Sequence, residues 1–208
     1  MRRKTKYAVR GTRPAGQTLV ELLIASAVIT TGMFAAATLV FSNLALIDRE
    51  ADEVFAVNLA REGIEEAKNV RDSNWLAGLP FDTYMYSGTD YTATPTWDGG
   101  AAGSFRVGFD FSATGITDPK AIVRQSGSAV TPSFNTQADD SAPATPFSRI
   151  LIFHPICGLP GSDPTYKDDG QTCGTDPKIG VRVESRIHWT RKGTTHDTSI
   201  YEDLYDWR

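Results

Sequence analysis

Hydrophobic residues are concentrated in one stretch near the start of the chain. Residues Leu22–Ile47 contain no Asp, Glu, Lys or Arg over 26 positions, and about 20 apolar residues suffice for a helix to cross a bilayer core. No proline occurs between Pro14 and Pro80, and proline is the residue that most disrupts a helix interior. The pattern therefore predicts one long helix over about residues 18–72. Its first part, residues 17–47, is apolar on all sides, as in a transmembrane helix.

Residues 48–74 have the spacing of an amphipathic helix. Apolar residues recur three and four positions apart and form one stripe: Ala56, Leu59, Ala60, Gly63, Ile64, Ala67 and Val70. The opposite face is polar: Asn58, Arg61, Glu62, Glu65, Asn69 and Asp72. We expect the stripe to pack on a separate domain and the helix to stop at the polar run Asp72-Ser73-Asn74.

From Trp75 onward the pattern changes to the alternation that is typical of β-strands. We expect strands over residues 105–111, 121–124, 129–133, 148–154, 178–189 and 199–207. The last two form a hairpin with its turn at Arg191-Lys192-Gly193, while the polar segments 134–146 and 158–177 are expected to be loops. The predicted fold class is α+β: a long N-terminal α-helix packed on an antiparallel β-sheet formed by residues 75–208.

Charge is also unevenly distributed. Residues 1–16 hold six Lys and Arg residues and no acid, so the remainder of the chain, with the total at −4, carries −10. A basic flank before an apolar span keeps that end in the cytoplasm, so we expect residues 1–16 to be a basic leader inside and the C-terminal domain to lie outside. The acidic remainder argues against direct nucleic-acid binding, which needs clustered basic residues.

The junction between leader and helix reads Gly16-Gln17-Thr18-Leu19-Val20-Glu21. A glycine ends the leader, the apolar helix begins at once, and a glutamate follows five residues after the glycine. A carboxylate within a membrane-spanning stretch is costly and is usually functional. Over about residues 11–45, this N-terminus resembles that of type IV prepilins and pseudopilins.

The resemblance implies a processing and assembly pathway. A prepilin peptidase would remove residues 1–16 by cutting between Gly16 and Gln17, and would methylate the new N-terminus at Gln17, where the family most often has Phe. Glu21 would neutralise the N-terminal amine of an adjacent subunit as a filament grows. The implied fold is pilin-like, with the first half of the helix transmembrane. The implied partners are other pilin subunits, the prepilin peptidase, cytoplasmic membrane lipid and the filament assembly machinery.

Three functions share this N-terminus. The first is a structural, minor pilin-like subunit of a type IV pilus-like filament, which we favour. The second is a pseudopilin of a type II secretion system, and the third is an adhesin or ligand-binding subunit at a filament tip. In each case the chain would span the bacterial cytoplasmic membrane once and then join an extracellular or periplasmic filament. The simplest alternative for residues 17–47 is an ordinary signal anchor.

The chain has two cysteines, Cys157 and Cys173. If the span places them outside the cytoplasm, a disulfide is expected, and a two-ligand metal site is the poorer alternative. A weak calcium candidate is the set Asp163, Asp168, Asp169 and Asp176, whose spacing fits no EF-hand loop, so a solvated turn is preferred. The three histidines are scattered and the usual catalytic motifs are missing from the sequence. We therefore expect neither an enzyme nor a cofactor.

The first prediction concerns processing. We expect the mature chain to begin at Gln17, because the basic leader ends in Gly16 and has no hydrophobic region of the secretory type. Mass spectrometry of the N-terminal peptide from membrane-isolated protein measures this directly. An intact leader in assembled material, or a cut at another bond, would contradict the prediction.

Overall fold

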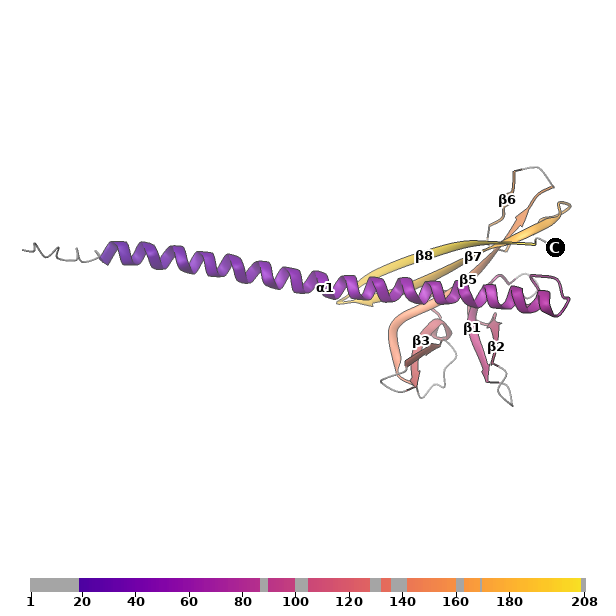
Figure 1. Ribbon diagram of the computed structural model, residues 1–208, viewed down its shortest axis with the longest axis horizontal. Helices are drawn as coiled ribbons and strands as arrows, with labels where there is room; N and C mark the ends of the chain where they lie inside the picture. The colour runs from indigo at the N-terminus through magenta and orange to yellow at the C-terminus, as the bar shows by residue number, and fades with distance from the viewer. Residues whose placement is uncertain are drawn as a thin grey trace, which may run out of the picture. The chain divides into compact units, whose positions relative to one another are not determined.

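The computed structural model describes residues 19–86, 90–99, 105–127, 132–135, 142–159, 163–168 and 170–206 (Figure 1). One long α-helix, α1 (Leu19–Leu76), precedes an antiparallel β-sheet. The chain divides into two compact units, one ending at Glu50 and the other beginning at Ala51. The part of α1 from Ala51 onward belongs to the second unit and packs on the sheet, so the α+β class is confirmed.

The predicted end of α1 at residues 72–74 is wrong, because the helix continues to Leu76. Its end is a Schellman turn. Gly78 adopts a positive φ of 71°, and the N–H of Leu79 donates to the carbonyl of Asn74 at 2.9 Å. This arrangement satisfies a carbonyl that the helix end would otherwise leave open.

Asn74 does not terminate the helix because its side chain has partners elsewhere. It is buried, and its amide donates to the carbonyls of Phe81 at 3.1 Å and Thr83 at 2.7 Å. The polar residue that suggested a stop signal therefore fastens the turn that follows α1 to the helix.

Strand β5 (Ala144–Cys157) is the centre of the sheet. One of its edges pairs with β7 (Lys178–Arg191) over most of its length. Its other partners follow one another along the strand: β3 (Ile122–Gly127), then β1 (Thr92–Gly99), then β6 (Thr165–Tyr166). All of these pairings are antiparallel.

Three further strands extend the sheet. Strand β8 (Thr194–Tyr205) pairs with β7, β2 (Phe105–Asp110) pairs with β1, and β4 (Pro132–Asn135) pairs with β3. The short 3₁₀ helix η1 (Pro119–Ala121) leads into β3.

Several strand boundaries differ from the prediction. Strand β1 was not predicted, since Pro95 and several threonines obscure its pattern. Pro95 cannot donate a ladder hydrogen bond, and the pairing of β1 with β5 involves only Thr92 and Ala93, which precede it. Strands β4 and β5 extend into the expected loop 134–146, and β6 lies within the expected loop 158–177.

The β7–β8 hairpin is confirmed, although β8 begins at Thr194, five residues earlier than expected. Arg191 pairs with Thr194, which leaves Lys192 and Gly193 as a two-residue loop. Both have positive φ, 48° and 80°, and two consecutive positive φ values match the twist of a tight hairpin.

The apolar stripe on α1 is confirmed, since all seven of its predicted residues are buried. Gly63 lies where helix and sheet approach closely. A Cβ atom there would lie 2.7 Å from Ser185 Oγ and 2.8 Å from Leu151 Cδ2. Both of those residues are fully buried, so neither side chain can move aside without disturbing the core.

A buried charge lies at the same interface. Arg149 on β5 has no exposed surface, and its Nη1 donates to the carbonyl of Leu59 at 3.2 Å and to Glu62 Oε2 at 3.1 Å. Its Nη2 lies 3.5 Å from Oε1 of Glu66, which is also buried. Glu62, assigned by its spacing to the polar face, is half-buried because it reaches this guanidinium.

The close approach at Gly63 generates a stability prediction. Gly63→Ala gains up to about 1 kcal/mol in helix propensity but overpacks the interface, which typically costs about 1–3 kcal/mol. We expect a net loss of about 1–2 kcal/mol, measured by urea unfolding of the disulfide-intact chain in detergent.

Gly32→Ala is the matched control, because a Cβ at Gly32 meets no atom within 4 Å. It should leave the unfolding of the sheet-containing unit unchanged. Equal midpoints for Gly63→Ala and the unsubstituted chain would contradict the close approach.

Candidate functional site: the apolar segment of α1 and the disulfide-closed loop

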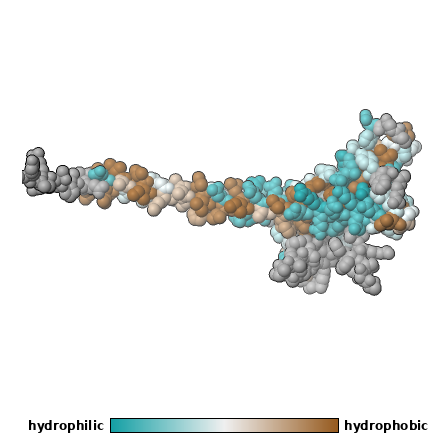
Figure 2. Space-filling model, viewed as in Figure 1, coloured by the Kyte–Doolittle hydropathy of each residue, from teal (hydrophilic) through white to brown (hydrophobic). Residues whose placement is uncertain are grey.

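The first part of α1 presents apolar side chains to its surroundings on every side. All residues from Leu19 to Ile47 are exposed, including Phe34 at 74 % and Phe41 at 70 %, and Figure 2 shows mainly hydrophobic residues on the visible face of this part of the helix. The segment is long and apolar enough to cross a membrane. Contiguous exposed apolar surface of this extent marks an interaction with membrane or protein.

The hydroxyl groups within this segment are bonded inside the helix. Ser26, Thr30, Thr31, Thr38 and Ser42 all donate to backbone carbonyls three or four residues earlier, at 2.8–3.0 Å. Such bonds remove the cost of placing a hydroxyl in hydrocarbon. The segment therefore fits an apolar medium better than its count of serines and threonines suggests.

Glu21 lies in α1, two residues after the helix begins, and its side chain is exposed. It is the only charged residue between Arg13 and Asp48. Gly16 and Gln17, the predicted cleavage and methylation positions, lie outside the described residues. The structure thus places the carboxylate on the apolar helix and leaves the processing site as a prediction.

The predicted disulfide is present. Cys157, the last residue of β5, is bonded to Cys173, with 5.5 Å between their Cα atoms. Within the loop that this bond closes, Tyr166 of β6 pairs with Ile156 of β5. The guanidinium of Arg182 on β7 lies 3.7 Å from the centre of the Tyr166 ring. The loop is therefore held to the sheet by backbone pairing and by a cation–π contact as well as by the covalent bond.

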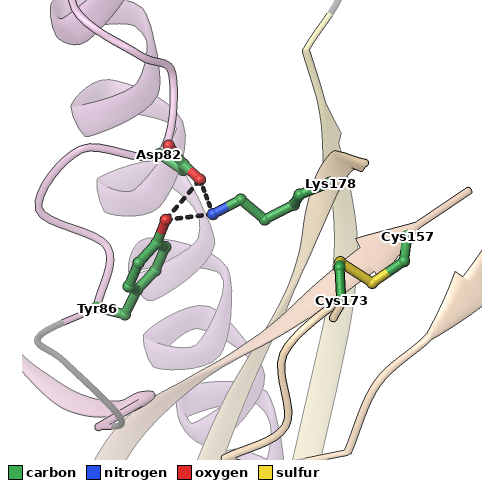
Figure 3. Close-up of a disulfide and its surroundings, with 5 residues drawn as sticks. All are labelled: Asp82, Tyr86, Cys157, Cys173 and Lys178. Atoms are coloured by element: carbon green, nitrogen blue, oxygen red, sulfur yellow. Dashed lines mark hydrogen bonds and ion pairs between the residues drawn. A yellow bond between two sulfur atoms is a disulfide. The ribbon is translucent and has the colours of Figure 1, made fainter. Parts of the chain in front are cut away.

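Beside the disulfide, a polar cluster joins the turn after α1 to the start of β7 (Figure 3). Tyr86 Oη donates to Asp82 Oδ2 at 2.8 Å, and Lys178 Nζ contacts both groups. Burial tends to lower the pKa of Lys178, but the hydrogen bonds to Asp82 and Tyr86 outweigh it and raise the pKa above its ordinary value. The ammonium therefore stays charged and holds the two segments together.

Sequence reasoning missed this cluster and the buried Arg149. Lys178 and Tyr86 are 92 positions apart, and no local pattern links them. A signal for Arg149 did exist, because it directly precedes the apolar run Ile150–Phe153. Strand alternation places its side chain on the same face as the second and fourth residues of that run. The disulfide was predictable because only two cysteines compete for the pairing.

The calcium candidates lie in and next to the disulfide-closed loop. Asp163, Asp168 and Asp176 are exposed, and Asp169 lies outside the described residues. Among the described residues, no three His, Cys, Asp or Glu side chains come together in a way that could hold a metal ion.

The three histidines make separate contacts on the sheet. His154 Nε2 lies 3.4 Å from Glu184 Oε2, and His188 Nδ1 lies 2.7 Å from Asp197 Oδ1. His196 stacks on Trp189 with 5.3 Å between ring centres. The described part of the chain therefore gives each histidine a different neighbour rather than gathering the three into one site.

Trp207, expected in the last strand, lies outside the described residues.

Comparisons with family models, with curated proteins and with solved structures gave no match to this chain.

The disulfide gives the third prediction. Replacing Cys157 and Cys173 with serine should lower the free energy of unfolding by about 3 kcal/mol, because the unfolded chain regains the freedom of a loop of this size. Urea unfolding with and without reductant measures the loss. The reductant should shift the unsubstituted protein and leave the variant unchanged.

Alkylation provides the chemical control. Two thiols should react only after reduction and denaturation. Thiols that react without reductant in protein from the native host, or a midpoint that reductant does not move, would contradict the pairing.

Proposed function

We propose that this chain is a membrane-anchored structural subunit, minor pilin-like, of a type IV pilus-like filament. The observation that carries the proposal is an exposed, apolar helix segment with a single carboxylate, Glu21, five residues after the glycine that ends a basic leader. An ordinary signal anchor needs length and hydrophobicity, but it has no need of Gly16 or Glu21 at this spacing. The proposal includes that the α+β arrangement described above is a pilin-like fold.

The two units have separate tasks in this proposal. The apolar segment of α1 holds the subunit in the cytoplasmic membrane and afterwards packs against the same segment of other subunits. Its exposed apolar surface suits both surroundings, because lipid and packed helices are equally free of water. The sheet-containing unit, stabilised by the disulfide, lies outside the cytoplasm, where disulfides persist.

Glu21 supplies the specificity of assembly. A carboxylate and an ammonium each cost several kcal/mol in a low-dielectric medium, and pairing recovers much of that cost. Cleavage after Gly16 creates an amine at Gln17, and Glu21 is then the fifth residue of the mature chain. The amine of one subunit and Glu21 of its neighbour would then form the pair, and only processed subunits could provide the amine.

A pseudopilin of a type II secretion system is the second candidate, because the same segment serves a short periplasmic filament equally well. Imaging of surface filaments before and after deletion of the gene separates the two. Loss of surface filaments supports the pilus. Intact surface filaments with a defect in protein export support the pseudopilin.

The fourth prediction tests the proposed role of Glu21. Glu21→Ala makes the helix more favourable to insert by about 2–3 kcal/mol, so membrane anchoring should be unchanged. Incorporation into filaments should fall strongly, because the neighbour's amine would be buried without a counter-charge. Immunoblots of membrane and sheared-filament fractions measure both quantities.

Glu50→Ala is the control, since it removes an exposed acid from the same helix outside the apolar segment. It should assemble normally. If Glu21→Ala and Glu21→Gln both enter filaments at the unsubstituted level, the ion-pair account is wrong.

A further inference from the structure

On the face of the sheet opposite α1 there is a shallow cavity of about 340 Å³ that is largely open to solvent. It is lined by Ile116, Arg186, Asp197, Thr198 and Ser199. Cavities that bind small molecules start at about 300 Å³. The cavity lies where the segment before η1 crosses β7 and β8, away from the disulfide-closed loop.

The strand pairing directs several polar side chains into one place. Arg186 lies opposite Ser199 and His188 lies opposite Asp197 in the β7–β8 ladder, so the side chains of each pair share a face. Tyr201 is the next residue on this face of β8, and it is 54 % exposed. Ile116, which packs near Ile150 and Ile152, supplies an apolar wall.

A buried carboxylate orients the polar groups. Glu184, 3 % exposed, accepts hydrogen bonds from Arg186 Nε and Ser199 Oγ, both at 2.9 Å. Burial tends to raise the pKa of Glu184, but these hydrogen bonds outweigh it and hold the pKa below its ordinary value. Arg186 therefore keeps a fixed direction while its side chain remains 40 % exposed.

The balance of charge selects the kind of ligand. Arg186 offers N–H donors beyond those that bind Glu184. Asp197, 60 % exposed, binds His188 Nδ1 through Oδ1 at 2.7 Å and offers the lone pairs of Oδ2. An anion would be repelled by Asp197 and a cation by Arg186. A neutral ligand with neighbouring hydroxyl groups satisfies both, because each hydroxyl donates and accepts. The apolar face of a ring would pack on Ile116, which lines the cavity.

We propose that this cavity is a binding site for a neutral sugar unit, with Arg186 and Asp197 as its polar contacts. The proposal depends only on the unit from Ala51 onward. It can therefore be correct or wrong whatever the outcome for the proposed filament function.

The test uses the full chain, purified in detergent with its disulfide intact. Glucose, galactose, mannose and their N-acetylamino derivatives are titrated by isothermal calorimetry, with inorganic phosphate as the anionic probe. We expect saturable binding of at least one sugar. Arg186→Gln and Asp197→Asn should each weaken it about tenfold, as the loss of one well-placed hydrogen bond to a charged group implies.

Asp163→Asn is the matched control, because it removes an exposed carboxylate outside the cavity and should leave sugar binding unchanged. Thermal unfolding shows whether each variant is folded. If Arg186→Gln destabilises the sheet, Asp197→Asn carries the test alone, since its side chain is largely exposed. Three results would overturn the proposal: no saturable binding of any sugar, binding that Asp197→Asn does not weaken, or phosphate that binds more tightly than the sugars.

Discussion

The buried guanidinium of Arg149 constrains how α1 lies on the sheet. A charge without solvent is tolerated only where its partners are in place, and those partners come from one face of the helix: the carbonyl of Leu59 and the carboxylates of Glu62 and Glu66. A rotation or a slide of α1 by one residue would separate them. Gly63 lies beside them in the sequence and allows the close approach. Packing and electrostatics thus specify the same helix register.

Local patterns in the sequence predict the parts of this fold that depend on near neighbours. The apolar stripe of α1 is a property of spacing, and all of it is buried. The β7–β8 hairpin follows from alternation and from the turn at Lys192 and Gly193. The end of α1 was predicted wrongly because Asn74 is satisfied by a turn that lies further along the chain. Strand β1 was missed because Pro95 and several threonines obscure its alternation, although its main partner, β2, follows it closely in the sequence.

The same distinction applies to the candidate functional residues. Glu21 is visible in the sequence because a single acid interrupts a long uncharged segment, and Cys157 has only one possible partner. The site on β7 and β8 could not be predicted, because Arg186 has no feature that separates it from its neighbours in the strand expected over 178–189, and Asp197 lies before the strand expected over 199–207. Their convergence depends on the ladder register and on a buried acid, Glu184.

The hydroxyl groups of the apolar segment affect how easily the helix can exchange one apolar neighbour for another. Thr30 and Thr31 already bond to their own helix, so neither has to exchange a partner when lipid is replaced by another apolar neighbour. Transfer between the two environments then involves no rearrangement of these polar groups. The charge of Glu21 and the amide of Asn43 are then the polar groups whose surroundings would change if the helix rotated about its axis or moved along a neighbour.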